Sequence, residues 1–106
     1  MKIRYIAAMT AALSFSTAAL AAGSGEALFK QSNCTACHAI DKKALGPSMK
    51  EVAAKYAGKK DAQANLEKKV RIGGSGVFGK MPMPATAKTV SDGDIKTMVA
   101  WILSLK

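Results

Sequence analysis

Both cysteines and the only histidine of this 106-residue chain lie in one short segment, NCTACHAI, at residues 33–40. Cys34, Cys37 and His38 form the pattern C-x-x-C-H. On a helical turn, residues three and four positions apart share a face, so the two thiols and the imidazole would point the same way. Thiol and imidazole groups are ligands for soft and borderline metals. The metal-binding chemistry of the whole chain is therefore concentrated on a single turn.

The pattern C-x-x-C-H is typical of the covalent attachment of a c-type haem. Its two thiols would add to the haem vinyl groups, while the neighbouring imidazole would bind the iron. A thioredoxin-like redox pair is a weaker interpretation, because it is expected in a βαβ context and no strand is predicted here. A structural zinc site needs four ligands, and the chain has no further cysteine or histidine. A chance match is the remaining alternative.

A second axial ligand must come from a methionine or a lysine, or the position is open, because His38 is the only histidine. Four of the six methionines have other predicted places, in an N-terminal leader or packed on helices: Met1, Met9, Met49 and Met98. Met81 and Met83 remain, each directly before a proline in the segment KMPMP. Proline fixes its own φ and pushes the preceding residue towards extended backbone. Either thioether could point inward, and prolines on both sides favour Met83.

Lys80 and Lys88 are nearby, but a lysine must lose its proton to bind iron, so methionine is favoured over both. Ligation by histidine and methionine is typical of cytochromes c that transfer single electrons. With both axial positions filled, no site remains for a substrate.

Residues 1–21 have the pattern of a secretory signal peptide: Lys2 and Arg4, an apolar run, and small residues at Ala19 and Ala21. An uncleaved membrane anchor is the alternative, but serines and threonines dilute the apolar run. Cleavage after Ala21 would leave one domain, residues 22–106. The formal net charge would fall from +9 to +7, because Lys2 and Arg4 leave without an acid.

A domain of this size usually needs a disulfide, a metal or another staple to be stable. Export permits a disulfide between Cys34 and Cys37, but that bridge would close only a tiny loop. A covalently bound haem would supply the missing core. The export signal and this missing core also argue against a chance occurrence of the motif.

Capping signals and apolar spacing predict four helices and no strand. Ser24 is a possible N-cap of the first helix, and Ser48 with Glu51 forms a capping box at the second. The predicted helices run roughly from residue 25 to 33, from 48 towards 58, from about 61 to 73–74, and from 91 to the C-terminus. The last has an apolar face of Ile95, Met98, Val99, Ile102 and Leu103. The segment GGSGVFGKMPMPATAKTV between the last two is a long irregular loop, and such loops are usually functional.

The mature chain resembles a class I cytochrome c, specifically the small bacterial c-551/c-552 type of the periplasm. The resemblance covers essentially all of residues 22–106 and rests on CTACHAI, ALGPSMKEVAAKYAG, GGSGVFGKMPMPA and AWILSLK. It implies an all-α fold, the small class I cytochrome c fold, with about four helices wrapped around one haem c. In that family the haem is attached through the two cysteines, here Cys34 and Cys37. The resemblance makes His38 and Met83 the axial ligands of the iron.

The resemblance also implies contacts around the site. The carbonyl of Pro47 would accept a hydrogen bond from the His38 imidazole, and the C-terminal helix with Trp101 would cross the first helix near Phe29. Lys69 falls where the family often has an arginine near a haem propionate, so a fork of donors is replaced by a point charge.

Two further departures concern the loop. Phe78 falls where a tryptophan often donates to a propionate, and a phenyl ring cannot donate. Ala85 and Thr86 follow the ligand segment where the family has Pro-Asn, so an amide contact to the methionine sulfur is absent. The reduction potential of relatives therefore cannot be transferred to this chain.

The implied function is that of a soluble periplasmic electron carrier with one haem, and not of an enzyme. It would shuttle single electrons between respiratory-chain donors, such as a cytochrome or a membrane complex, and a terminal reductase, peroxidase or oxidase. The alternative is a haem-based sensor or catalyst in which Met83 is a labile ligand. A monomer without stable membrane insertion is expected, and nucleic acid is a poor partner for an exported chain without an aromatic stacking platform.

Fourteen lysines and arginines against seven acids leave the mature surface basic. Such a surface would attract acidic redox partners and make association rates salt-sensitive. The candidates for this steering lie close in sequence to the ligand segments: Lys42, Lys43, Lys80 and Lys88.

Overall fold

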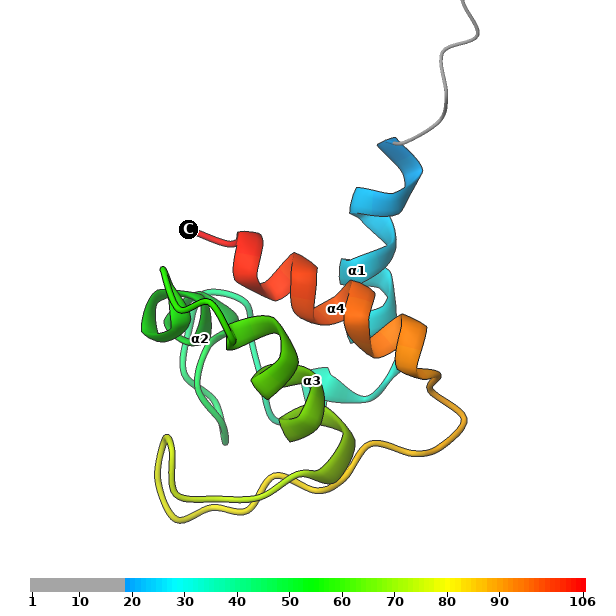
Figure 1. Ribbon diagram of the computed structural model, residues 1–106. Coiled ribbons are helices and arrows are strands. Elements are labelled where there is room, and N and C mark those ends of the chain that lie inside the picture. The colour runs from blue at the N-terminus through cyan, green and yellow to red at the C-terminus, as the bar shows by residue number, and fades with distance from the viewer. Residues whose placement is uncertain (1–18) are drawn as a thin grey trace, which may run out of the picture.

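The computed structural model describes the backbone of residues 19–106 and the side chains from residue 25 onward. This part of the chain is helical and contains no strand, only an isolated antiparallel bridge between Gly74 and Met83. The predicted all-α fold with four helices is confirmed (Figure 1). Its elements are helix α1 (Ala19–Gln31), the 3₁₀ turn η1 (Cys34–Ala36), and helices α2 (Met49–Tyr56), α3 (Ala62–Ile72) and α4 (Asp92–Ser104).

The predicted starts of α2 and α4 are confirmed by their caps. The Ser48 hydroxyl oxygen accepts a hydrogen bond from the backbone N–H of Glu51 at 3.0 Å, and that of Ser91 accepts from Asp94 at 3.1 Å. Each bond satisfies one of the first backbone donors of its helix. Helix α3 ends at Gly73, whose φ of 77° takes the chain out of the helical path.

The predicted start of the first helix is wrong. Helix α1 begins at Ala19, so Ser24 lies inside the helix and is not its N-cap. Residues 19–22 are alanine and leucine, which are strong helix formers, and the helix continues through the weaker Gly23, Ser24 and Gly25. The proposed cleavage site after Ala21 falls within α1, and residues 1–18 of the predicted signal peptide lie outside the described residues. Between residues 19 and 106, no helix has both the length and the apolarity needed to cross a bilayer.

Helix α4 is the centre of the core and packs against each of the other three helices. Its Ile95, Met98 and Val99 are almost completely buried. Burying each such side chain stabilises the fold by roughly 1.5–3 kcal/mol. Helix α1 crosses α4 where Phe29 meets Trp101, with ring centroids 5.3 Å apart, as the resemblance implied.

Replacing Gly25 by alanine is expected to destabilise the protein by about 2 kcal/mol, because the new methyl group overpacks the contact between α1 and α4. A Cβ atom at this position would lie 2.4 Å from Cβ of Trp101. The matched control is Gly93→Ala in α4, where the nearest atom, Oγ of Ser91, is 3.9 Å away. That change should stabilise α4 by up to about 1 kcal/mol. Urea unfolding followed by circular dichroism measures both, and a Gly25→Ala protein as stable as the parent would contradict the close packing.

Candidate functional site

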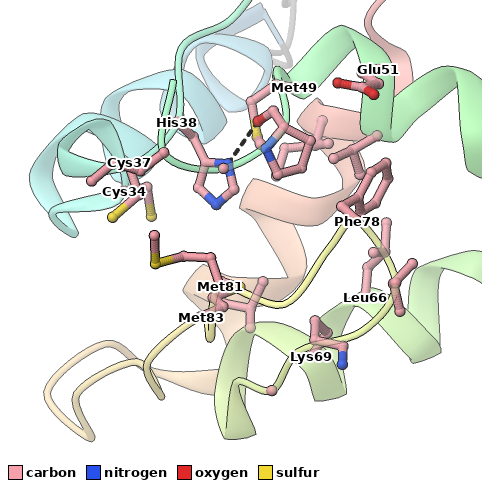
Figure 2. Close-up of a pocket in the computed structure, with 18 of the residues that line it drawn as sticks. Cys34, Cys37, His38, Met49, Glu51, Leu66, Lys69, Phe78, Met81 and Met83 are labelled. Carbon is pink, nitrogen blue, oxygen red and sulfur yellow. Dashed lines mark hydrogen bonds between the residues drawn. The ribbon is translucent and has the colours of Figure 1, made fainter. Parts of the chain in front are cut away.

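One cavity of about 220 Å³ lies between the turn after α1 and the loop after α3 (Figure 2). The wall brings together all six site residues named from the sequence: Cys34, Cys37, His38, Pro47, Lys69 and Met83. Apolar side chains from all four helices line much of the remainder, including Phe29, Val52, Leu66, Met98, Val99 and Ile102. The core of the protein therefore continues into the cavity as an apolar lining.

The two cysteines are presented by η1 and the residue after it. Asn33 precedes the turn in the left-handed region with a φ of 63°, and the N–H of His38 donates to the carbonyl of Cys34 at 2.9 Å. Both thiols are free, and in Figure 2 their sulfur atoms point to the same side as the His38 ring. Burial raises the pKa of the Cys34 thiol, so this group is protonated at neutral pH.

The ring of His38 is fixed by the carbonyl of Pro47, 2.8 Å from Nδ1. A proline carbonyl can only accept, so the hydrogen is on Nδ1 and the lone pair of Nε2 is left available. Nε2 faces the interior of the cavity in Figure 2. Gly46 lies against the ring, because a Cβ atom there would be 2.6 Å from Cε1 of His38. The hydrogen bond from the His38 imidazole to the Pro47 carbonyl, which the resemblance implied, is present.

Met81 and Met83 lie across the cavity from His38 (Figure 2). Of the two methionines, only Met83 has backbone hydrogen bonds. Its N–H donates to the carbonyl of Gly74 at 2.8 Å, and the N–H of Gly74 donates to the carbonyl of Met83 at 2.9 Å. The carbonyl of Met83 also packs against Gly73, where a Cβ atom would be only 2.3 Å away. Met83 is half-buried, whereas the side chain of Met81 is 64% exposed. The two thioethers are therefore held very differently.

The structure places charged groups on the rim that the sequence did not single out. The ammonium of Lys55 lies 5.3 Å from the centroid of the Phe78 ring, and that of Lys59 lies 5.3 Å from the Tyr56 ring. Both rings line the cavity.

Of the four lysines proposed for steering, Lys43 lines this cavity. Lys88 lines a separate surface hollow beside Arg71 and Asp92. Lys69 is half-buried on the cavity wall.

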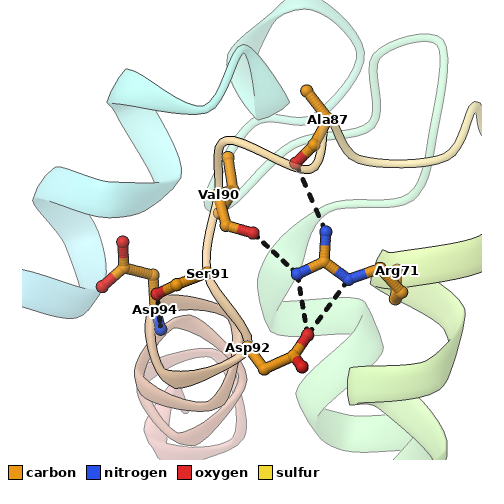
Figure 3. A network of polar contacts seen from close by, with 6 residues as sticks. All are labelled: Arg71, Ala87, Val90, Ser91, Asp92 and Asp94. Carbon is orange, nitrogen blue, oxygen red and sulfur yellow. Dashed lines mark hydrogen bonds and ion pairs between the residues drawn. The ribbon is translucent and has the colours of Figure 1, made fainter.

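Arg71 is a further residue that sequence analysis missed. Its guanidinium joins the last turn of α3 to the loop and to the first turn of α4 (Figure 3). Its partner Asp92 is 21 residues away, and no local pattern connects the two.

The side chains around the cavity fit a c-type haem. Two free thiols share one turn, an imidazole offers Nε2, and thioethers lie on the opposite wall of an apolar cavity. No cluster of three or more cysteine, histidine, aspartate or glutamate side chains that could hold a metal ion occurs within residues 19–106. An imidazole and a thioether on opposite walls suit a metal that brings its own equatorial ligands.

Comparison with known proteins gives the same answer. Cytochrome c-551 of Pseudomonas aeruginosa is 49% identical over 81 residues, which cover 76% of this chain and 76% of that relative. Cytochrome c-552 of Nitrosomonas europaea is 47% identical over 93 residues, or 85% of this chain and 89% of the relative. The crystal structure of wild-type Nitrosomonas europaea cytochrome c552 superposes with a TM-score of 0.72 at 48% identity, covering 76% of this chain and 99% of the other.

The family model for cytochrome c matches residues 22–106, which include every site residue discussed above. The helical architecture and the C-x-x-C-H turn agree with that match. The chain therefore belongs to the cytochrome c family, as a small class I member of the c-551/c-552 type, and is a monohaem electron-transfer cytochrome with Cys34 and Cys37 as its haem-attachment pair.

Proposed function

We propose that this protein is a periplasmic one-electron carrier whose haem iron is bound by Nε2 of His38 and the thioether of Met83. The observation that carries the proposal is the cavity itself, where a fixed imidazole and a backbone-anchored methionine lie on opposite walls. When bound, haem c supplies an iron centre that alternates between the ferric and ferrous states. The protein contributes ligands, orientation and exclusion of water.

His38 and Pro47 act together in this proposal. The hydrogen bond to the Pro47 carbonyl holds the ring orientation and the tautomer, and it increases the basicity of the ligating nitrogen. A ring fixed in this way needs little rearrangement when the charge of the metal changes. Gly46 allows the close approach of its backbone to the ring.

Met83 is favoured over Met81 because its position is already fixed. The paired hydrogen bonds to Gly74 and the contact with Gly73 order its backbone, so little conformational entropy remains to be lost on ligation. The backbone of Met81 takes no part in that bridge, and its side chain is mostly exposed. The resemblance to the family's ligand segment supports the same assignment.

The predicted signal peptide supports the proposed location. The proposed ligand set supports the absence of enzymatic activity. A signal peptide cleaved after about Ala21 would deliver residues 22–106 to the periplasm, where haem c is attached. Two axial protein ligands leave no open position for a substrate.

The proposed partners are acidic redox proteins, a donor on one side and a terminal reductase, peroxidase or oxidase on the other. We define the rim lysines as Lys43, Lys55 and Lys59, which line the cavity or lie over rings that line it. Among the described side chains, from residue 25 onward, the ion pairs are Lys30–Glu26 and Arg71–Asp92. Neither pair uses a rim lysine. The positive charge of the rim lysines is therefore available to an approaching anionic surface.

Changing Met83 to alanine is expected to abolish the far-red sulfur-to-iron absorption band of the oxidised protein, because the thioether ligand is lost. Changing Met81 to alanine should leave the band in place. Visible spectra of the two purified holoproteins give the answer. A band that survives in the Met83 variant and disappears in the Met81 variant would reverse the assignment.

The parent protein provides the test between an electron carrier and a sensor. With both axial positions filled, the ferrous protein should bind carbon monoxide slowly at neutral pH. Rapid binding by the parent would instead favour a labile Met83 and the sensing or catalytic alternative.

Replacing the three rim lysines by glutamine is expected to slow oxidation of the reduced protein by ferricyanide about three-fold or more at low salt, because the anion is no longer attracted to the rim. The difference should shrink as ionic strength rises to 0.15 M, where the screening length is about 8 Å. Stopped-flow kinetics at several salt concentrations measure both effects.

The control replaces three other exposed lysines, Lys68, Lys96 and Lys106, so the change in net charge is identical. It should leave the rate much closer to that of the parent. Equal losses in the two triple variants would mean that total charge, and not the rim, controls encounter.

A further inference from the structure

Arg71, in the last turn of α3, hydrogen-bonds to the segment that runs from Met83 to α4 (Figure 3). Its Nη1 donates to the carbonyl of Ala87 at 3.3 Å, and its Nη2 donates to that of Val90 at 2.6 Å. Nε and Nη2 also donate to Oδ1 of Asp92, at 3.2 and 2.8 Å. One guanidinium therefore contacts both ends of the turn at residues 87–90 and the first residue of α4.

The backbone continues this attachment towards the ligand. The N–H of Thr86 donates to the carbonyl of Val70 at 3.2 Å, and Met83 is paired with Gly74. Residues 70–74, at the end of α3, thus hold the segment of residues 83–92 at successive points. Among the described side chains, Arg71 is the one whose hydrogen bonds join these two segments.

The bond to the Val90 carbonyl matters more than the ion pair or the exposed bond to Ala87. The side chain of Asp92 is 94% exposed, so its attraction to Arg71 is screened by water. The side chain of Arg71 is only 28% exposed, and its bond to Val90 is partly buried. A partly buried carbonyl that loses a charged donor loses stabilisation that water replaces incompletely. Lysine carries the same charge but cannot reproduce the fork of donors.

We propose that Arg71 is a positioning residue that keeps Met83 in place by anchoring the segment that follows it. The inference rests on the proposed ligation by Met83. A thioether that rotates away returns readily unless its backbone also moves, and Arg71 restricts that movement. It does so by holding Ala87, Val90 and Asp92 to the end of α3. The Arg71 side chain does not line the cavity, and none of its hydrogen bonds goes to Met83.

The test uses the oxidised holoprotein and imidazole as a competing ligand. The rate at which added imidazole removes the far-red band reports how often Met83 departs. Arg71→Gln should raise this rate about tenfold, as expected for the loss of a charged hydrogen-bond set. Arg71→Lys should fall between Arg71→Gln and the parent, because it restores charge without the fork.

The matched control is Gln63→Ala. Nε2 of Gln63 donates to the carbonyl of Lys96 at 3.1 Å, so this side chain also joins α3 to α4, but it does not touch the loop. It should leave the imidazole rate within about two-fold of the parent, even if unfolding shows a similar loss of stability. Equal acceleration in the Gln63 and Arg71 variants would overturn the inference, because loosening of α3 on α4 would then be sufficient.

Amide hydrogen exchange gives a readout that does not depend on the iron. The N–H groups of Met83 and Thr86 should exchange faster in Arg71→Gln and at the parent rate in Gln63→Ala; unchanged exchange in Arg71→Gln would overturn the inference. If Arg71→Gln does not fold, Arg71→Lys is compared with Gln63→Ala in the same two measurements. If the parent protein lacks the far-red band, the proposed ligation by Met83 is contradicted. If the parent has the band but the Arg71 variants do not behave as expected, only the Arg71 inference fails.

Discussion

The buried face of α4 is the constraint on which the site depends. Ile95, Met98 and Val99 contact the rest of the core from one helix, and the principal contacts between α-helices all include α4. Helix α1 leads directly to the cysteines and His38, whereas α3 leads to the methionine loop. These two segments lie on opposite walls of the cavity because each of their helices packs separately on α4. The packing of α1 and α3 on α4 therefore sets the separation of the two walls.

Each wall then fixes its own donor by short-range contacts. On one wall, the turn at Cys34 and the carbonyl of Pro47 orient the imidazole within a span of fourteen residues. On the other, the donor sits in an irregular loop that has no helix or sheet to hold it. Hydrogen bonds at the base of that loop, between Gly74 and Met83, take over this role. The tip is a tight turn in which the N–H of Gly76 donates to the carbonyl of Gly79 at 2.8 Å, and both glycines have positive φ values.

Much of this arrangement was predictable because its determinants are local. Serine caps at Ser48 and Ser91, the glycine stop at Gly73 and the apolar spacing of α4 each act over a few residues, and each marked a helix correctly. The start of α1 was missed because Gly23, Ser24 and Gly25 suggest a helix boundary, whereas the helix runs through them from the strong helix formers before them. The contacts of Arg71 with Asp92 and of Lys55 with Phe78 join residues more than twenty positions apart, and only the packing of the helices brings them together. No periodicity contains that information.

The rim of the cavity is where we expect the reduction potential of this chain to depart from that of its relatives. Where the family often places an indole N–H, Phe78 instead presents a ring face, and that face lies beneath the ammonium of Lys55. Lys69 adds a second positive group on the cavity wall, half-buried and so less screened than a fully exposed lysine. Positive charge near a redox centre favours its reduced state, by an amount that depends on distance and on solvent access. The exposed Lys55 and the half-buried Lys69 therefore contribute unequally, and exchanging an indole donor for a cation–π pair changes the electrostatics as well as the shape of the rim.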